Sequence, residues 1–319
     1  MSANRIWVLT DERPGNQSQA KGVAQALEQP FDIVQIDYDW AVGLPNLVRG
    51  QSLLGLSEAA RARFAEPWPK LAISAGRRIA PAMRWLKRTT GARLVQIMDP
   101  GWPGRADFDL IAIPEHDEAR NEPNVLHTAG APYRPLPDMT EEERARVAHM
   151  IGDLPRPWLV VFVGGNNKNY PFGPDLAHEL MRDSKVLAEK LGASLLVLTS
   201  KRSGAAVADA LEADMPPRSY LYKWRPGGDN PFLQVLTMAD AIVATGDSMS
   251  MCSEACANGG PVYIFAPERL VSDKYRLLHQ KLYDGGYARP LGGDATPWRH
   301  PPLDAAIAVA DEIRKRGLL

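Results

Sequence analysis

Short apolar runs alternate with helix-length segments along most of the chain, and this alternation constrains the fold more than any other feature. The runs IWVLT (6–10), LAISAG (71–76) and WLVVFV (158–163) are continuously apolar rather than apolar at every second position. Such runs are typical of strands in a parallel sheet that helices cover on both faces. The sequence therefore predicts an α/β protein with doubly wound, Rossmann-like sheets.

The alternation occurs in two series, which indicates two domains. The chain has 319 residues, a natural length for two domains of roughly 150 residues each. The stretch DLPRPW (153–158) interrupts the pattern with two prolines and suggests a linker. We therefore expect one domain at 1–153, with 139–152 as its last helix, and another at 154–319. The terminal helix of the second domain could pack back on the first. In open α/β sheets ligands bind at the carboxyl ends of the strands, and two such ends can face a shared cleft.

Charge and hydropathy argue against two classes of protein, those that bind nucleic acid and those that span a membrane. The net charge of −1 gives no electrostatic footprint for nucleic acid. No apolar run approaches the ~20 residues that a membrane-spanning helix requires. The amino-terminal stretch shows no signal-peptide pattern. We expect a cytoplasmic protein, and peripheral membrane contact through an amphipathic surface helix stays open.

Three loops of the second half follow predicted strands and share one chemistry. They are GGNNKNYPFG (164–173), SKRSG (200–204) and GDSMSMCSEACANGG (246–260). Glycines let the backbone approach an anion closely, and the start of a helix favours negative charge. The candidate nucleotide-binding residues are Gly164, Gly165, Asn166, Lys168, Thr199, Ser200, Lys201, Arg202, Gly246, Asp247, Ser248, Ser250 and Glu254, which the family resemblance described below implies would bind a nucleotide sugar.

Within these loops two side chains have specific predicted roles. Lys168 could reach a phosphate, although no Gly-Lys-Ser/Thr sequence makes this a P-loop. Glu254 could accept hydrogen bonds from the two hydroxyls of a ribose, as acidic residues do in nucleotide-binding α/β folds. The alternative is that the loops are ordinary turns and capped helix starts.

The loops of the first half indicate an acceptor side. TDERPGNQSQ (10–19) has one glycine and lacks G-x-G-x-x-G, which argues against an NAD-dependent short-chain epimerase or dehydrogenase. Polar residues there could bind an acceptor, and two arginines at a later helix start suit an anion. The acceptor-side candidates are Gly15, Asn16, Gln17, Arg77 and Arg78.

Three residues are candidates for the catalytic base. Asp11 and Asp99 follow predicted strands, and His116 lies in a loop. A lone histidine in a loop is more often solvated or structural. Cys252 and Cys256 are spaced to share one helix face, but no nearby histidine completes a zinc site, so we expect two packed thiols and no metal.

The segments WVLTDERPGNQSQAKGVAQAL (7–27) and DNPFLQVLTMADAIVATGDSMSMCSEACANGGPVYIF (229–265), with the VFVGG loop, resemble the mitochondrial fission ELM family over most of the chain. The resemblance implies the GT-B fold of glycosyltransferases and a ribose-binding role for Glu254. Bacterial members are described as predicted nucleoside-diphosphate-sugar epimerases. The plant homologue is regarded as a mitochondrial-surface factor that recruits a dynamin-related GTPase. The GGH acceptor loop of the peptidoglycan GlcNAc transferase is absent, and RPGNQSQ stands in its place.

Three hypotheses follow. The first is a metal-independent glycosyltransferase that uses a nucleoside-diphosphate sugar, with a UDP-sugar favoured and the acceptor unknown. The second is a nucleotide-sugar epimerase on the same fold. The third is a non-catalytic adaptor, for which tryptophans in the irregular segments could form an exposed apolar patch, unless they pack inside. These tryptophans are Trp40, Trp68, Trp102 and Trp298.

Overall fold

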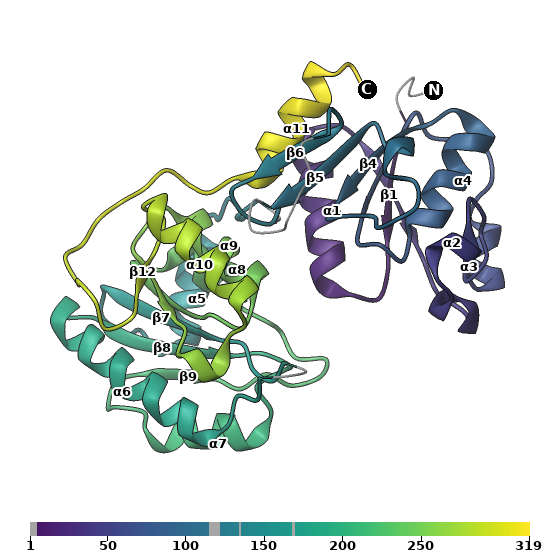
Figure 1. Cartoon of the computed structure of the whole chain (residues 1–319). Coiled ribbons are helices and arrows are strands. Elements are labelled where there is room, and N and C mark those ends of the chain that lie inside the picture. The colour runs from purple at the N-terminus through teal and green to yellow at the C-terminus, as the bar shows by residue number, and fades with distance from the viewer. Residues whose placement is uncertain (1–4, 115–121, 134, 168–169) are drawn as a thin grey trace. The chain divides into compact units, whose positions relative to one another are not determined.

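The computed structural model describes residues 5–114, 122–133, 135–167 and 170–319. The chain divides into two compact units (Figure 1). The first unit comprises residues 1–135 and 304–319, and the second comprises 136–303. The expected domain boundary near residue 153 therefore lies inside the second unit.

The first unit contains a six-stranded sheet in the order β2-β1-β3-β4-β5-β6, and all its strand pairs are parallel. The strands are β1 (Ile6–Thr10), β2 (Phe31–Gln35), β3 (Leu71–Ala75), β4 (Arg93–Ile97), β5 (Leu110–Pro114) and β6 (Val125–Thr128). Two of them, β1 and β3, coincide with the runs IWVLT and LAISAG, which the sequence predicted as strands.

Helices cover both faces of this sheet, which explains the continuously apolar runs. Ile6 and Val8 of β1 share a core cluster with α1 and α11, whereas Trp7 and Leu9 share another with α4. The first unit contains α1 (Pro14–Ala26), η1 (Trp40–Gly43), α2 (Asn46–Arg49), α3 (Glu58–Ala62), α4 (Ala80–Thr90), η2 (Arg105–Asp107) and α11 (Ala305–Lys315). The terminal helix α11 lies against α1, so the end of the chain completes the first unit.

The second unit contains a parallel sheet in the order β9-β8-β7-β10-β11-β12. Counted from β7 this is 3-2-1-4-5-6, the order of dinucleotide-binding Rossmann sheets. The strands are β7 (Trp158–Val163), β8 (Ser194–Thr199), β9 (Tyr220–Tyr222), β10 (Ala241–Thr245), β11 (Val262–Phe265) and β12 (Arg289–Pro290). The sequence prediction missed β12, which has two residues and no apolar run.

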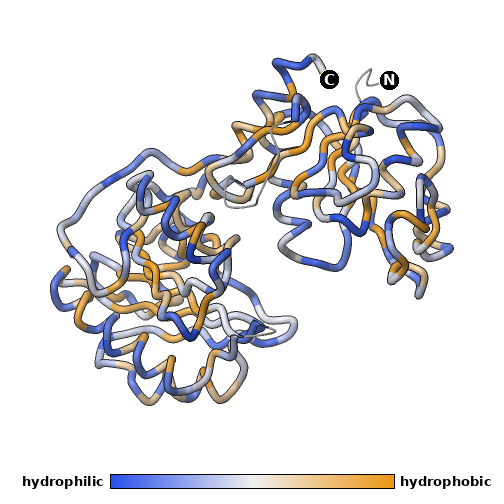
Figure 2. Tube along the Cα trace, in the orientation of Figure 1, coloured by the Kyte–Doolittle hydropathy of each residue, from blue (hydrophilic) through white to orange (hydrophobic). Residues whose placement is uncertain are grey.

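The helices of the second unit are α5 (Glu141–Met150), α6 (Pro174–Leu191), α7 (Ala205–Ala213), α8 (Phe232–Met238), α9 (Met249–Ala255), η3 (Cys256–Asn258), η4 (Glu268–Leu270) and α10 (Asp273–Asp284). Buried apolar residues run along the strands of both sheets, while the outer helix faces are polar (Figure 2). The chain thus folds into two doubly wound α/β units, as the sequence predicted.

The helix that the sequence predicted at 139–152 belongs to the second unit rather than to the first. Thr140 caps α5 and forms a reciprocal capping box with Glu143. Val147 and Ile151 of this segment pack with Trp158 in a core cluster of the second unit. A local apolar pattern shows that a helix has a face to bury, but not which sheet receives it.

Each sheet has a point where the strand order reverses. In the first unit this point lies between β1 and β3, and in the second it lies between β7 and β10. Ligands of open α/β sheets bind beyond the carboxyl ends of the strands at such points. The loops after β1, β3, β7 and β10, together with the helices that follow them, contain most of the residues that the sequence singled out.

Candidate functional site

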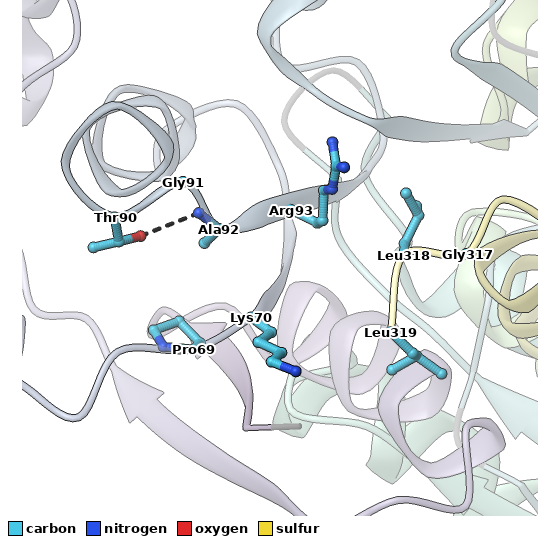
Figure 3. A pocket seen from close by; sticks show the side chains of 9 residues that line it. All are labelled: Pro69, Lys70, Thr90, Gly91, Ala92, Arg93, Gly317, Leu318 and Leu319. Atoms are coloured by element: carbon cyan, nitrogen blue, oxygen red, sulfur yellow. Dashed lines mark hydrogen bonds between the residues drawn. The ribbon is translucent and has the colours of Figure 1, made fainter. Parts of the chain in front are cut away.

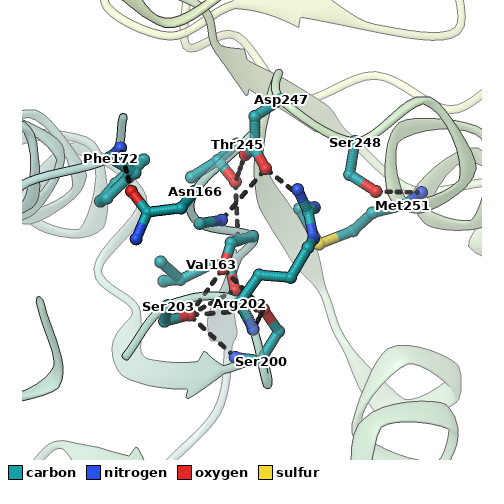
Figure 4. A network of polar contacts seen from close by, with 12 residues as sticks. Val163, Asn166, Phe172, Ser200, Arg202, Ser203, Thr245, Asp247, Ser248 and Met251 are labelled. Atoms are coloured by element: carbon teal, nitrogen blue, oxygen red, sulfur yellow. Dashed lines mark hydrogen bonds and ion pairs between the residues drawn. The ribbon is translucent and has the colours of Figure 1, made fainter. Parts of the chain in front are cut away.

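Three loops of the second unit meet beyond the carboxyl ends of β7, β8 and β10 (Figure 4). Asp247 joins them. Its carboxylate accepts hydrogen bonds from the Thr245 hydroxyl at 2.6 Å and from the Gly165 amide at 3.0 Å. It also forms an ion pair with Arg202, with 2.8 Å between Nη2 and Oδ2. The hydroxyl of Thr245 accepts a hydrogen bond from the Gly164 amide at 2.8 Å.

Burial dominates the electrostatics of Asp247. Its side chain is fully buried, whereas 40% of the Arg202 side chain is exposed. Removal from water raises the pKa of Asp247, and the charge of Arg202 acts in the opposite direction. The acid therefore holds Arg202 at the sheet edge with part of its side chain exposed to solvent.

The two positions after β7 require glycine because the loops after β8 and β10 lie too close for a side chain there. A Cβ at Gly164 would lie 2.3 Å from Asp247 Oδ2. Gly165 has φ +144°, and a Cβ there would lie 2.2 Å from the backbone carbonyl of Arg202. Any side chain at either position would push the three loops apart.

The hydroxyls of this region bind the protein's own backbone. Ser200 and Ser203 both donate to the carbonyl oxygen of Gly164 at 2.6 Å. Thr199 donates to the Tyr222 carbonyl at 3.2 Å and accepts from the Trp224 amide at 2.8 Å. These side chains fix the position of the loop after β8, and their hydroxyls are already hydrogen-bonded within the protein.

The remaining residues of the first two loops take different positions. The side-chain oxygen of Asn166 accepts from the Phe172 backbone amide at 2.9 Å. The Asn166 backbone amide donates to the Arg202 carbonyl oxygen at 3.1 Å. Lys201 is exposed beside Arg202. Lys168 lies outside the described residues.

The loop after β10 begins helix α9. Gly246 lies against His279, whose Cε1 would be 2.6 Å from an added Cβ. Ser248 caps the helix by accepting from the Met251 amide at 3.4 Å. Ser250 and Glu254 follow in α9 and are both half-buried, so Glu254 is not sealed inside the protein.

Sequence reasoning missed Tyr275 in the first turn of α10. The charges of Arg202 and Asp247 both influence the pKa of its phenol, in opposite directions, and its hydroxyl hydrogen-bonds with the side chain of Asn167. Burial raises the pKa of Tyr275, so the phenol stays protonated. About thirty positions separate it from Asp247, and no local pattern marks it.

Cys252 and Cys256 are buried, free thiols. Burial raises the pKa of both thiols above the usual range, which disfavours the thiolate that metal binding and nucleophilic attack require. In the described part of the chain, no three histidine, cysteine or acidic side chains are grouped closely enough to hold a metal.

In the first unit, two acceptor-side candidates after β1, Asn16 and Gln17, hydrogen-bond to Asp11. Asp11 is buried and accepts from the Arg13 amide at 3.1 Å and from the Asn16 side chain at 3.3 Å. Gln17 donates to the Asp11 carbonyl at 2.6 Å. Helix α1 already begins at Pro14, so Gly15 lies in its first turn rather than in a loop.

The other proposed bases differ in position. Asp99 follows β4 and is 46% exposed. It forms an ion pair with Arg105 at 2.9 Å and accepts from the Gly101 amide at 3.0 Å. His116 lies outside the described residues.

Arg77 and Arg78 line a hollow of about 580 Å³ beyond the carboxyl ends of the first sheet. Arg13, Asn46, Arg49 and Trp102 line it as well, and sequence reasoning assigned a role to none of them as a ligand-binding residue. We call this hollow the arginine pocket. Arg78 forms an ion pair with Glu12 at 2.8 Å.

A smaller hollow, of about 250 Å³, lies at the opposite edge of the first sheet (Figure 3). Lys70 and Arg93, beside the starts of β3 and β4, line it together with Leu318 and Leu319. The Ala92 amide donates to Thr90 Oγ1 at 3.2 Å in its wall. Amino ends of parallel strands are not where open α/β sheets bind ligands, so we assign no function to this hollow.

The tryptophans of the irregular segments divide into two groups. Trp68 packs against Trp7, and Trp298 packs edge-on against Tyr263. Trp40 and Trp102 are 84% and 74% exposed. Among the described helices, none combines the length and the apolar character needed to span a bilayer.

Comparison with known sequences gives a consistent family. The family model described as Mitochondrial fission ELM1 matches residues 14–317. An uncharacterized protein of Rickettsia prowazekii, RP120, is 26% identical over 345 aligned positions that cover 97% of each chain. The mitochondrial fission protein ELM1 of Arabidopsis thaliana is 27% identical over 304 positions, which cover 86% of this chain and 70% of the plant protein.

Solved structures share the fold at low identity. The UDP-GlcNAc 2-epimerase of Methanocaldococcus jannaschii aligns over 98% of this chain and 99% of its own, with a TM-score of 0.53 and 12% identity. The glycosyltransferase SnogD of Streptomyces nogalater aligns over 99% and 95%, with a TM-score of 0.52 and 15% identity. The fold is therefore the GT-B fold of glycosyltransferases and related epimerases, as the sequence resemblance implied.

Proposed function

We propose that this chain, which belongs to the mitochondrial fission ELM1 family, binds a nucleoside-diphosphate sugar in its second unit and transfers the sugar to an acceptor. The observation that carries the proposal is the network of Asp247, Arg202 and the glycines after β7. It lies at the strand-order reversal of a 3-2-1-4-5-6 sheet, where such sheets bind nucleotides.

Arg202 is the residue we assign to the diphosphate. Its guanidinium has five N–H donors, and the ion pair with Asp247 leaves some of them free. Two loops and a buried acid fix its position, so little side-chain entropy is lost when an anion binds. Exposed Lys201 adds a second positive charge at the same loop.

We assign the ribose to Glu254 and leave Ser250 as a second polar contact. Glu254 is half-buried in α9, which follows β10 directly. A carboxylate on that helix can accept two hydrogen bonds from the paired hydroxyls of a ribose.

In the reaction, a hydroxyl oxygen of the acceptor attacks the anomeric carbon of the sugar, and the bond from that carbon to the diphosphate breaks. Arg202 and Lys201 stabilise the negative charge that develops on the departing diphosphate. A base removes the acceptor proton. Both described candidates accept hydrogen bonds, but Asp99 is 46% exposed whereas Asp11 is buried, so we retain Asp99.

An epimerase is the second candidate. A UDP-GlcNAc 2-epimerase of Neisseria meningitidis, solved with UDP-GlcNAc bound, aligns over 98% of this chain with a TM-score of 0.51. At 13% identity this likeness concerns the fold alone. An epimerase would use the same donor residues and no acceptor.

Calorimetry of the full chain with UDP, ADP and GDP tests the proposal. We expect UDP to bind, Arg202→Gln to weaken it at least tenfold, and Arg182→Gln, an exposed arginine on α6, to leave it unchanged. If none of the three nucleotides binds the wild-type protein, the enzyme hypotheses fail and the non-catalytic adaptor is favoured.

Incubation with UDP-GlcNAc alone separates the two enzymes. NMR detection of an epimer without any acceptor would support the epimerase. Binding of the donor without epimer formation would support the transferase.

A further inference from the structure

The arginine pocket of the first unit has more positive charge than its surroundings balance. Arg13, Arg49 and Arg77 line it, and none of them pairs with a carboxylate in the described part of the chain. The fourth arginine, Arg78, is neutralised by Glu12. Asp39, whose charge acts on Arg49, is itself paired with Arg61 at 3.0 Å.

Arg49 is the most unusual of the four because it is buried, with 1% of its surface exposed. Its Nε donates to the Leu54 carbonyl at 3.0 Å, and its Nη1 donates to the Arg78 carbonyl at 2.8 Å. Its Nη2 has no hydrogen-bond partner among the described residues. A buried charged donor without a partner is costly, and a bound anion would remove that cost.

The backbone is shaped to hold Arg49 in place. Gly55 has φ +90°, and a Cβ there would lie 2.9 Å from the Val42 amide and 3.0 Å from Arg49 Nε. The Asn46 side chain donates to the carbonyls of Arg77 and Pro100, at 3.0 and 3.2 Å, and so ties α2 to the loops after β3 and β4. The pocket is therefore built from segments that are fixed to one another.

The number of unpaired charges indicates the class of ligand. A carboxylate carries one negative charge, whereas a phosphate monoester or a diphosphate carries about two or more at neutral pH. Guanidinium groups match phosphate oxygens through paired hydrogen bonds. Three unpaired arginines thus fit a phosphate group better than a carboxylate.

Apolar side chains are exposed beside the same pocket. Leu47 and Val48, between Asn46 and Arg49 on α2, are 58% and 62% exposed, and Trp102 lines the pocket itself. An anion pocket with an apolar rim suits a ligand with a phosphate at the end of an apolar group.

We propose that the arginine pocket binds a terminal phosphate or diphosphate of the acceptor. The evidence for a phosphate site comes from the first unit alone. Only the identification of the ligand as the acceptor rests on the proposed function. The phosphate could belong to a lipid or to a soluble molecule, and the experiment separates these two sources.

Calorimetry of the full chain with inorganic pyrophosphate is the first arm. Pyrophosphate also suits the second unit, so binding is measured in an Arg202→Gln background, in which the diphosphate site of that unit is weakened. We expect Arg77→Gln and Arg13→Gln each to weaken the remaining pyrophosphate binding at least tenfold. Arg88→Gln, which changes an exposed arginine of α4 that does not line the pocket, should change it less than twofold.

Co-sedimentation with vesicles is the second arm. Vesicles with phosphatidic acid, a phosphate monoester, are compared with vesicles of equal charge made with phosphatidylglycerol, a diester. A lipid source predicts stronger pelleting with phosphatidic acid, loss of it in Arg77→Gln, and loss also in a Leu47→Ser/Val48→Ser variant that still binds pyrophosphate. A soluble source predicts pyrophosphate binding with equal, weak pelleting on both vesicles.

The proposal is overturned if Arg77→Gln and Arg13→Gln change neither pyrophosphate binding nor pelleting. Arg49→Met tests the buried arginine, and the two exposed arginines keep the test valid if that variant does not fold. If UDP binds but Arg77→Gln leaves pyrophosphate binding and pelleting unchanged, this inference alone is refuted. Pyrophosphate binding that depends on Arg77, without any nucleotide binding, would refute the donor proposal alone.

Discussion

The side chain of Arg314 donates a hydrogen bond to the carbonyl oxygen of Ala26 at 2.8 Å, although 288 positions separate the two residues. It links the end of α11 to the end of α1. Ala306, Val309 and Ile313 of α11 are buried in the core cluster that contains Val23 of α1. The first unit is thus closed by the last residues of the chain.

Truncating the buried face of α11 should destabilise the first unit. Ile313→Ala removes a fully buried side chain and should lower the free energy of unfolding by about 2–5 kcal/mol. Ile307 lies on the same helix but is 48% exposed, so Ile307→Ala should cost less than about 1 kcal/mol. Urea unfolding measures both, and equal losses would contradict the packing of α11.

Gly165→Ala should disrupt the loops around Asp247. The new Cβ would overlap the Arg202 carbonyl, so the loss of stability should exceed the roughly 1–2 kcal/mol of a left-handed backbone alone. Gly227→Ala is the matched control, because Gly227 also has positive φ but nothing within 4 Å of an added Cβ. Thermal melting with and without UDP compares them. A Gly165 variant that melts like the Gly227 variant would refute the close approach.

Arg202 and Asp247 should be energetically coupled. Arg202→Ala leaves a buried carboxylate short of a partner and should cost roughly 1–3 kcal/mol. In an Asp247→Asn background the same change should cost less, because no buried charge remains. Arg182→Ala, which removes an exposed pair with Asp183, should cost at most about 0.5 kcal/mol. A double-mutant cycle by urea unfolding gives the coupling, and additive costs would contradict it.

Asp247 should also produce a specific pH dependence. Burial raises its pKa in the folded protein above the ordinary value, so between these two values the folded state binds more protons than the unfolded state. Its contribution to stability therefore falls as pH rises from about 4 through the folded pKa. Asp247→Asn should remove this slope from the free energy of unfolding. A wild-type stability that instead rises relative to the variant over this range would show that the ion pair outweighs burial.

Glu254→Ala should weaken UDP binding by about 1–3 kcal/mol, as for a lost hydrogen bond to a charged group. Glu189→Ala, on the outer part of α6, is the control because its side chain is exposed. Calorimetry at one salt concentration measures both. Unchanged affinity in Glu254→Ala would remove this residue from the donor site, while the role of Arg202 would still stand on its own variant.

Part of the candidate site was predictable because it follows local rules. A strand followed by Gly164 and Gly165, and another followed by Gly246 and Asp247, indicated a binding edge without any structure. The same reasoning treated Ser200 as a ligand-binding candidate, but the Gly164 carbonyl occupies its hydroxyl. The hydrogen-bond partner of a hydroxyl depends on how close the loop from a neighbouring strand lies. The sequence does not give the distance between two loops.

The sequence by itself predicted the strands except β12, their parallel arrangement and the division into two sheets, because continuously apolar runs are typical of strands that helices cover on both faces. Tertiary structure decided that α5 joins the second sheet and α11 the first, since hydrophobic burial has no direction and an apolar face fits either core. It also decided that Arg49 is buried without a full set of partners while Trp102 is exposed beside it. Burial of a single charged side chain depends on the loops that close over it, and those loops come from four separate parts of the chain.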